Sequence, residues 1–145
     1  MILVLGLASP VRADGDLTAA VAAVYGSRTV DADLHAIAHE RVVEISSCGG
    51  CMNHNGMRAG TAEVLGYNGG YGDPIAKVVH DWRGSAMHNG ILSDRGLGRI
   101  GCAHRVVNGG HYFICVLATG GSWSGPPRPP APGGETLSLP DTAMR

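Results

Sequence analysis

Residues 78–92, VVHDWRGSAMHNGIL, begin as an amphipathic helix and then lose that pattern. Four apolar residues occupy the i, i+3, i+4 and i+7 positions of one helical face: Ile75, Val78, Val79 and Trp82. Pro74 comes directly before them, and proline is favoured at the first position of a helix. Gly84 and Ser85 then interrupt the helix, so we expect the chain to leave it there and to carry His88 to the edge of a polar cleft.

Two further helices are indicated before this segment. Residues 16–25, DLTAAVAAVY, are typical of a short helix that is capped by Asp16 and ended by Gly26. A second helix begins at Asp31 and places the following residues on one side: Leu34, Ala38, Arg41 or Val42, and Ile45. Residues 46–60 are rich in glycine, serine and asparagine, which indicates a loop.

The second half of the chain indicates strands as well as the helix at residues 74–84. Residues 61–67 are short and strand-like, or form a tight extended turn. Residues 99–118 hold two β-like runs around Asn108-Gly109-Gly110, which is typical of a hairpin turn. Helices followed by a closing hairpin predict an α+β domain, layered as an α-β-α sandwich. We assign residues 14–119 to this domain.

The composition limits the classes of function. The chain has 145 residues, which suits a single domain with a buried core. Its formal net charge is −1, so the overall charge does not favour nucleic acid or anionic lipid as a partner. We also expect no transmembrane span, since the apolar segments are too short.

Both ends of the chain differ from the domain between them. The apolar run at residues 2–8 precedes Val11-Arg12-Ala13, which resembles a small-x-small cleavage site. We therefore interpret residues 1–13 as a signal segment of a secreted protein, with an N-terminal strand of the fold as the alternative. Residues 120–145 are dominated by proline and glycine, which predicts a disordered tail.

Four cysteines, an even number, agree with export from the cell. If the hairpin turn centres on residues 108–110, Cys102 and Cys115 lie opposite each other on paired strands, within reach of a disulfide. Cys48 and Cys51 are separated by two glycines that allow a tight local ring. A single CxxC does not make a zinc ribbon, and this one follows a helix instead of opening one, so we favour a structural disulfide over a thioredoxin-type redox site.

Three polar residues in separate segments are candidates for chemistry: His54, Glu63 and His88. Two imidazoles and one carboxylate are a possible ligand set for a zinc ion with an open position, or a general acid–base group. By residue type alone, three scattered residues of these kinds are more often surface or hydrogen-bonded groups.

Other histidines favour simpler interpretations. His35 and His39, at positions i and i+4 of a helix, could bind a metal together, although a solvent-facing polar stripe is the simpler interpretation. His80 points away from the apolar helix face. His104 and His111 flank the hairpin turn, where exposed polar residues are expected.

Taken together, these segments resemble the CAP superfamily, the SCP domain of cysteine-rich secretory proteins, antigen 5 and pathogenesis-related proteins, in a bacterial-type secreted form. Residues 81–92, DWRGSAMHNGIL, resemble the family's W-x-x-S-x-x-H-x(2,3)-I-L segment. Residues 99–118 are similar to its closing hairpin, and residues 53–67, NHNGMRAGTAEVLGY, to its H…GEN stretch. The resemblance covers roughly residues 17–118.

The resemblance implies a three-layer α-β-α sandwich with a closing antiparallel hairpin, and a secreted protein. It also implies a cleft with two histidines and two acidic residues, to which His54, Glu63 and His88 correspond. The second acid has no match, because Ser85 stands near its place, and the family's GEN triplet reads AEV here. A zinc site would therefore rest on His54, Glu63 and His88.

Three functions remain open. We favour a secreted binding module for a small hydrophobic ligand such as a lipid or sterol, a metal, or an extracellular protein, because the sequence shows no positioned nucleophile. The second is a metal-dependent hydrolase, such as a peptidase, in which His54 and His88 hold zinc and Glu63 is a third ligand or a general base. A weaker variant pairs Ser85 with His88. The third is a structural cell-envelope protein whose His–Glu–His group only stabilises the cleft.

Overall fold

A computed structural model of the chain describes residues 10–124. Within these residues the helices are α1 (Pro10–Tyr25), α2 (Ala32–Ser46), α3 (Pro74–Gly84) and α4 (Ala86–Leu92). The strands are β1 (Ser27–Val30), β2 (Thr61–Asn68), β3 (Leu97–Val107), β4 (Gly110–Ala118), β5 (Gly120–Gly121) and β6 (Trp123–Ser124). In this part of the chain, no helix has the length and apolar character that crossing a lipid bilayer requires.

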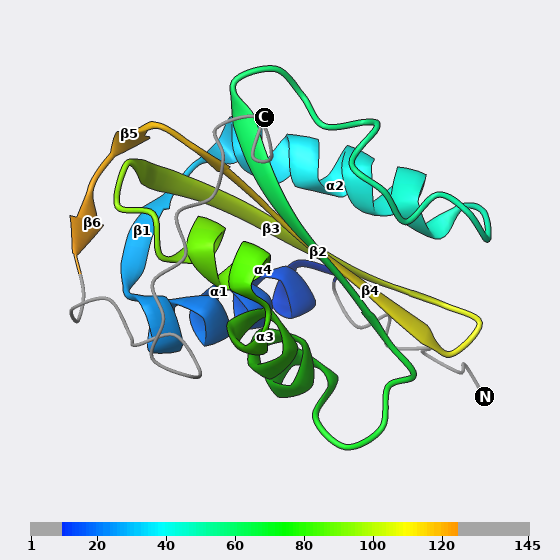
Figure 1. Ribbon diagram of the computed structural model, residues 1–145. Helices are drawn as coiled ribbons and strands as arrows, with labels where there is room; N and C mark the ends of the chain where they lie inside the picture. The colour runs from blue at the N-terminus through cyan, green and yellow to red at the C-terminus, as the bar shows by residue number, and fades with distance from the viewer. Residues whose placement is uncertain (1–9, 125–145) are drawn as a thin grey trace, which may run out of the picture.

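The strands form one mixed sheet whose two faces are covered by helices (Figure 1). The order across the sheet is β2-β4-β3-β1-β6, with β5 beside β3. β4 is antiparallel to both β2 and β3, whereas β1 is parallel to β3. α2 packs on one face, and α1, α3 and α4 cover the other (Figure 1). The α+β sandwich predicted from the sequence is confirmed.

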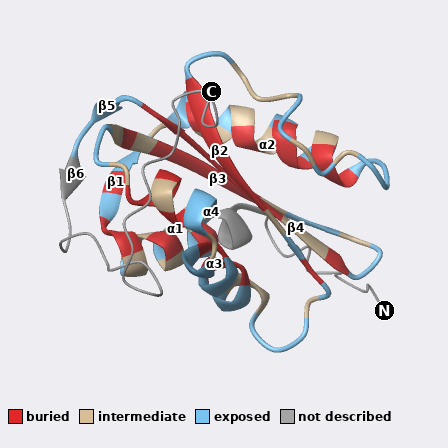
Figure 2. Ribbon diagram, viewed as in Figure 1, coloured by how far each residue is buried: buried red, intermediate tan, exposed pale blue. Residues whose placement is uncertain are grey.

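Each face of the sheet has its own apolar core, and the strands are the most continuously buried part of the fold (Figure 2). On the α2 face the core consists of Leu34, Ala38, Val42, Ile45, Leu65, Ala103, Ile114, Val116 and Ala118. On the other face it includes Leu17, Val21, Tyr25, Val64, Val79, Trp82, Leu92, Phe113 and Leu117. Successive residues of a strand point to opposite faces, so the same strands supply both cores.

The β3–β4 hairpin turns at Asn108 and Gly109, whose φ angles are 50° and 79°. Two-residue turns with positive φ at both positions match the twist of the flanking strands. This turn sets the register in which Cys102 faces Cys115, and the two residues form a disulfide. A second disulfide joins Cys48 to Cys51, so both predicted pairings are confirmed.

Asp31 caps the start of α2, because its carboxylate accepts hydrogen bonds from the backbone N–H groups of Asp33 and Leu34 at 2.9 and 3.0 Å. The helix lies very close to β3. A Cβ atom at Gly101 would overlap the backbone of Leu34 and His35. Glycine at position 101 therefore allows the close approach of α2 to the sheet.

The segment at residues 78–92 folds as two helices, whereas the sequence predicted one helix and an irregular continuation. α3 ends at Gly84, as expected, and Trp82 on its buried face donates its indole N–H to a β2 carbonyl oxygen at 2.7 Å. Ser85 then caps α4, because its hydroxyl oxygen accepts a hydrogen bond from the backbone N–H of His88 at 3.5 Å. With only 7 residues, α4 is too short to show helical periodicity in the sequence.

α1 starts earlier than predicted. It begins at Pro10, before the expected cap at Asp16, and so overlaps the end of the predicted signal segment, residues 1–13. Residues 1–9 lie outside the described part of the chain, so most of that predicted segment does as well.

The sheet extends past the predicted end of the domain. β5 pairs with β3, and β6 pairs with β1, within the segment 120–145 that was predicted to be a tail. The first residues of that segment are ordered into strands because β1 and β3 have backbone groups left to pair. Residues 125–145 lie outside the described residues.

Candidate functional site

Glu63 lies in the middle of β2 at a position that belongs to the core. Its neighbours Ala62 and Val64 contribute to the core on the α3 face, so the Glu63 side chain points to the α2 face. The side chain is only 1% exposed. A buried carboxylate is costly unless it is paired and hydrogen-bonded, so its partners decide what it can do.

Arg41 of α2 is the main partner of Glu63. Its Nε donates to Oε2 of Glu63 at 3.0 Å and its Nη2 donates to Oε1 at 2.6 Å, so both carboxylate oxygens are used. The hydrogen bond to Glu63 is the main cause that raises the pKa of Arg41. Burial acts to raise the pKa of Glu63, but the hydrogen bonds from His54 and Arg41 outweigh burial and lower that pKa.

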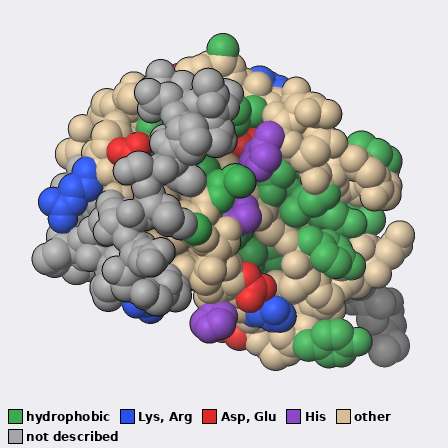
Figure 3. Space-filling view, in the orientation of Figure 1, with side chains coloured by type: hydrophobic (Ala, Val, Ile, Leu, Met, Phe, Trp, Pro, Cys, Tyr) green, Lys and Arg blue, Asp and Glu red, His purple; other side chains and the backbone are tan. Residues whose placement is uncertain are grey.

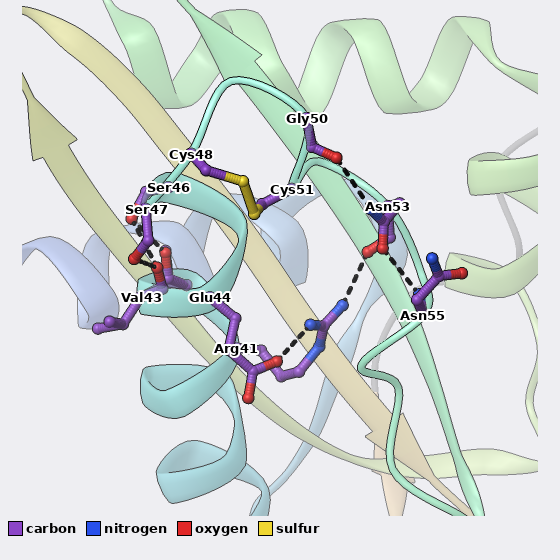
Figure 4. The surroundings of a disulfide bond; sticks show 11 residues. Arg41, Val43, Glu44, Ser46, Ser47, Cys48, Gly50, Cys51, Asn53 and Asn55 are labelled. Carbon is purple, nitrogen blue, oxygen red and sulfur yellow. Dashed lines mark hydrogen bonds and ion pairs between the residues drawn. A yellow bond between two sulfur atoms is a disulfide. The ribbon is translucent and has the colours of Figure 1, made fainter.

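Arg41 also holds the loop that follows α2 (Figure 4). Its Nη2 donates to the main-chain carbonyl oxygen of Asn53 at 2.9 Å. The Cys48–Cys51 disulfide closes the chain directly before Asn53 (Figure 4). The arginine and the disulfide therefore restrain the loop on which His54 lies.

Further ion pairs extend this cluster toward the solvent. Glu44 accepts hydrogen bonds from Nη1 of Arg41 at 2.6 Å and from Nη2 of Arg58 at 2.8 Å. Nη2 of Arg58 also lies 3.0 Å from Oε2 of Glu40. The hydrogen bond from Arg58 is the main cause that lowers the pKa of Glu44. Because these outer groups are partly exposed, each pair adds little stability on its own.

His54 contacts the buried pair from the solvent side. Its Nδ1 lies 3.0 Å from Oε1 of Glu63, and its side chain is 45% exposed. A carboxylate that binds one ring nitrogen fixes the orientation of the ring and directs the other nitrogen, Nε2, away from the carboxylate. The structure thus brings His54 and Glu63 together.

His88 lies close to His54 but has different partners. Its Nδ1 is 2.9 Å from Oγ of Ser85. Burial lowers the pKa of His88, and the nearby His54 lowers it further. Among residues 10–124, no hydrogen bond joins His88 to His54 or Glu63. Figure 3 shows histidine side chains at two places near the middle of one face, with hydrophobic and acidic groups close by.

The predicted three-ligand zinc site does not fit this arrangement. Both oxygens of Glu63 accept hydrogen bonds from Arg41, so a metal at Glu63 would compete with a buried ion pair. In the part of the chain that the structure describes, no three His, Cys, Asp or Glu side chains form a group that could hold a metal. Glu63 instead orients His54.

Two other histidine pairs lie outside this cluster. His35 and His39 on α2 have their Nε2 atoms 3.2 Å apart. Nε2 of His104 lies 2.8 Å from Nδ1 of His111. From the sequence, His104 and His111 were expected to be exposed, but both are half-buried. The ring of His104 stacks on Phe113 at a centroid distance of 4.4 Å.

A cavity of about 420 Å³ lies elsewhere, between α1, β1 and the start of α2. Its walls are mostly apolar and include Val21, Ala22, Val30, Ile100 and His35. His54, Glu63 and His88 are not among its lining residues. The molecule therefore has a polar candidate site and a separate, mostly apolar cavity.

No protein-family model matches the chain, and no curated protein matches it either. Solved structures do match. The first is an outer surface protein from Borrelia burgdorferi, which is 16% identical with a TM-score of 0.56, over 76% of this chain and 92% of that chain. Another is NaASP2, solved with Zn²⁺, which is 11% identical with a TM-score of 0.53, over 88% of this chain and 92% of that chain.

A third match is venom allergen-like protein 4 of Schistosoma mansoni, which is 12% identical with a TM-score of 0.50, over 97% of this chain and 99% of that chain. All three are CAP-family structures. The chain has the CAP superfamily fold.

In this CAP fold, Arg41 is the residue of the candidate site that was not singled out from the sequence. The helical spacing placed either Arg41 or Val42 on the buried side of α2, and both are buried. The available signal was a charged residue on each of two core-facing positions, Arg41 on the helix and Glu63 on the strand. Two opposite charges at core positions of elements that pack together predict a buried ion pair.

Proposed function

We propose that the protein is a secreted CAP-like binding module that takes a small apolar ligand in the cavity between α1 and β1. The cavity carries this proposal, because its volume of about 420 Å³ and mostly apolar walls match small-molecule sites, which span roughly 300–1,000 Å³. Transfer of a hydrocarbon chain from water to such walls is favourable. Val21, Val30 and Ile100 supply the larger apolar surfaces.

Two disulfides support export, since such bonds persist in oxidising compartments. In this proposal residues 1–13 are removed, and the mature chain begins near Asp14. N-terminal sequencing of the protein recovered from the medium of producing cells tests this step. Recovery of the protein only inside the cells, with residues 1–13 attached, would contradict it.

Glu63 is poorly suited to the alternative function, a metal-dependent hydrolase. A general base must reach a water molecule that is about to attack the substrate. The carboxylate of Glu63 is 1% exposed and both of its oxygens accept hydrogen bonds from Arg41. This arrangement supports a structural role for Glu63, with His54 as the exposed member of the cluster.

One contact favours a second candidate function, a hydrolase that uses Ser85. Oγ of Ser85 lies 2.9 Å from Nδ1 of His88, a distance suited to a nucleophile and its base. The same hydroxyl group caps α4, which accounts for the contact without catalysis. If this candidate is correct, ester hydrolysis by the purified protein is abolished in Ser85→Ala. Hydrolysis that is equal in the wild type and in Ser85→Ala would exclude it.

Titration with a fluorescent long-chain fatty acid tests the apolar site. Ala22 lines the cavity, and Ala22→Phe places a large side chain there, so we expect its Kd to rise at least about tenfold. Ala23, the next residue of α1, is exposed and is not a lining residue, which makes Ala23→Phe the matched control. Equal affinities in the wild type and both variants, or no binding by the wild type, would rule out this ligand site.

A further inference from the structure

His35 and His39 lie one helical turn apart, on the same side of α2. Their Nε2 atoms are 3.2 Å apart, their ring planes meet at 72°, and their ring centroids are 4.6 Å apart. The distance between the ring centroids is therefore only moderately longer than the distance between the two Nε2 atoms. The ring planes are inclined to each other, and Nε2 is the nitrogen of each ring that faces the other ring.

The pair formed by His104 and His111 shows what a simple hydrogen bond between imidazoles looks like in this molecule. The two nitrogens are closer, at 2.8 Å, yet the centroids are farther apart, at 5.0 Å. The two ring planes are only 27° apart, and 2.8 Å is the length of an ordinary hydrogen bond between two ring nitrogens. In the α2 pair the two nitrogens are farther apart than in the His104–His111 pair, whereas the ring centroids are closer together.

We propose that His35 and His39 chelate a divalent transition metal such as Zn²⁺, Ni²⁺ or Cu²⁺. Zn–N bonds of about 2.0–2.1 Å, drawn to two nitrogens that are 3.2 Å apart, enclose an angle of roughly 100°, close to the tetrahedral value. Imidazole is a preferred ligand of these metals. When the ion binds, the proton between the two Nε2 atoms moves through solvent to Nδ1 of the ring that carried it, so that each neutral ring holds its hydrogen on Nδ1 and offers Nε2 to the ion.

The position of the pair is compatible with metal entry. Both side chains are half-buried, so each ring is partly accessible to solvent. In the described residues no third His, Cys, Asp or Glu completes a metal-binding group here. His35 also lines the apolar cavity, which places the metal pair at the wall of that cavity. The metal pair does not depend on the proposed ligand function.

Calorimetric titration of the full chain with zinc chloride alone tests the proposal. Loss of one of two imidazole ligands should weaken zinc binding at least about tenfold, so we expect this effect in His39→Gln. His80 on α3 is an 87% exposed histidine, and His80→Gln is the matched control with unchanged affinity. Binding should also weaken as the pH falls, because protons compete with the metal for the ring nitrogens.

The histidines of the other candidate site are tested in the same titration. The double variant His54→Gln/His88→Gln should retain the zinc affinity that His39→Gln loses. The opposite pattern, with zinc binding lost in the double variant and kept in His39→Gln, would overturn the proposal and assign the metal to the His54–His88 site. Equal zinc binding in all variants would overturn it as well.

Discussion

The two faces of the sheet are stabilised by different kinds of interaction, although the same three strands supply both. The face under α1, α3 and α4 is an apolar core, with Trp82 and Phe113 fully packed in it. The face under α2 contains a buried ion pair, Arg41–Glu63, beside its apolar residues. An apolar core depends on the volume of each residue, whereas the α2 face depends on two residues that are needed together.

Two buried arginines show the same contrast. Arg28, near the end of α4, donates to the carbonyl oxygens of Leu92 and Leu97, each at 2.6 Å, and burial lowers the pKa of Arg28 to about 10. Arg41 is paired with a carboxylate, and its hydrogen bond to Glu63 raises its pKa instead. At Arg41 the hydrogen bond to a carboxylate is the larger effect on the pKa, whereas at Arg28 burial is the larger effect.

The largest expected effect is on the α2 face. Arg41→Ala leaves the carboxylate of Glu63 buried without its main partner, and we expect the free energy of unfolding to fall by about 3–5 kcal/mol. Chemical denaturation measures this loss. The double variant Arg41→Met/Glu63→Met should lose much less, since no charge stays buried. A double variant as unstable as Arg41→Ala would show that the pair is not the cause.

On the opposite face, Leu117→Ala should cost about 2–5 kcal/mol, because it leaves a cavity in the core that includes Phe113 and Trp82. The same denaturation experiment measures it. A substitution at Glu63 should not compensate for this loss, because Leu117 and Glu63 lie on opposite faces. Strong coupling between Leu117→Ala and Glu63→Gln in a double-mutant cycle would show that the faces do not act independently.

Acidification should reduce the stability contributions of His88 and Glu63 in separate pH ranges. The pKa of folded His88 lies below 6.5, so the unfolded chain takes up the proton first and stability falls as the pH drops below 6.5. The pKa of folded Glu63 lies below 4.5, so its contribution is present above pH 4.5 and is lost as the pH falls through the folded value. Thermal melts across pH measure both ranges. His88→Asn should flatten only the upper one.

The smallest effects concern the helix caps on the two faces. Asp31 caps α2 and Asp73 caps α3, and replacing either with alanine should lower the free energy of unfolding slightly. Asp31 also pairs with Arg99 at 2.9 Å, so Asp31→Ala should be the more costly of the two. Comparison of the two denaturation midpoints measures the difference, and a greater loss in Asp73→Ala would contradict this ranking.

Local patterns in the sequence predicted much of the fold. The apolar spacing of α3, the Asp31 cap and the turn at Asn108 are local signals, and the hairpin register that follows from the turn also predicted the Cys102–Cys115 disulfide. α4 and the pairing of β6 with β1 were missed, because a helix of 7 residues and strands of 2 residues carry no period and depend on neighbours distant in the chain.

The candidate site was predictable only in part for the same reason. The sequence identified His54, Glu63 and His88 as a group, and the structure joins His54 to Glu63 by a hydrogen bond and gives His88 a separate partner, Ser85. What the sequence lacked was the position of Arg41 in space. Its two hydrogen bonds convert Glu63 from a candidate metal ligand into half of an ion pair.

Gly101 determines how closely α2 can pack on the sheet. One methyl group added there would meet the main chain of α2 at Leu34 and His35 and would push the whole helix outward. A shift of α2 would also move the residues that it carries, among them Arg41, His35 and His39. Arg41 would then lie farther from Glu63. The presence of a hydrogen atom instead of a carbon at one strand position therefore governs two distant arrangements of side chains at once.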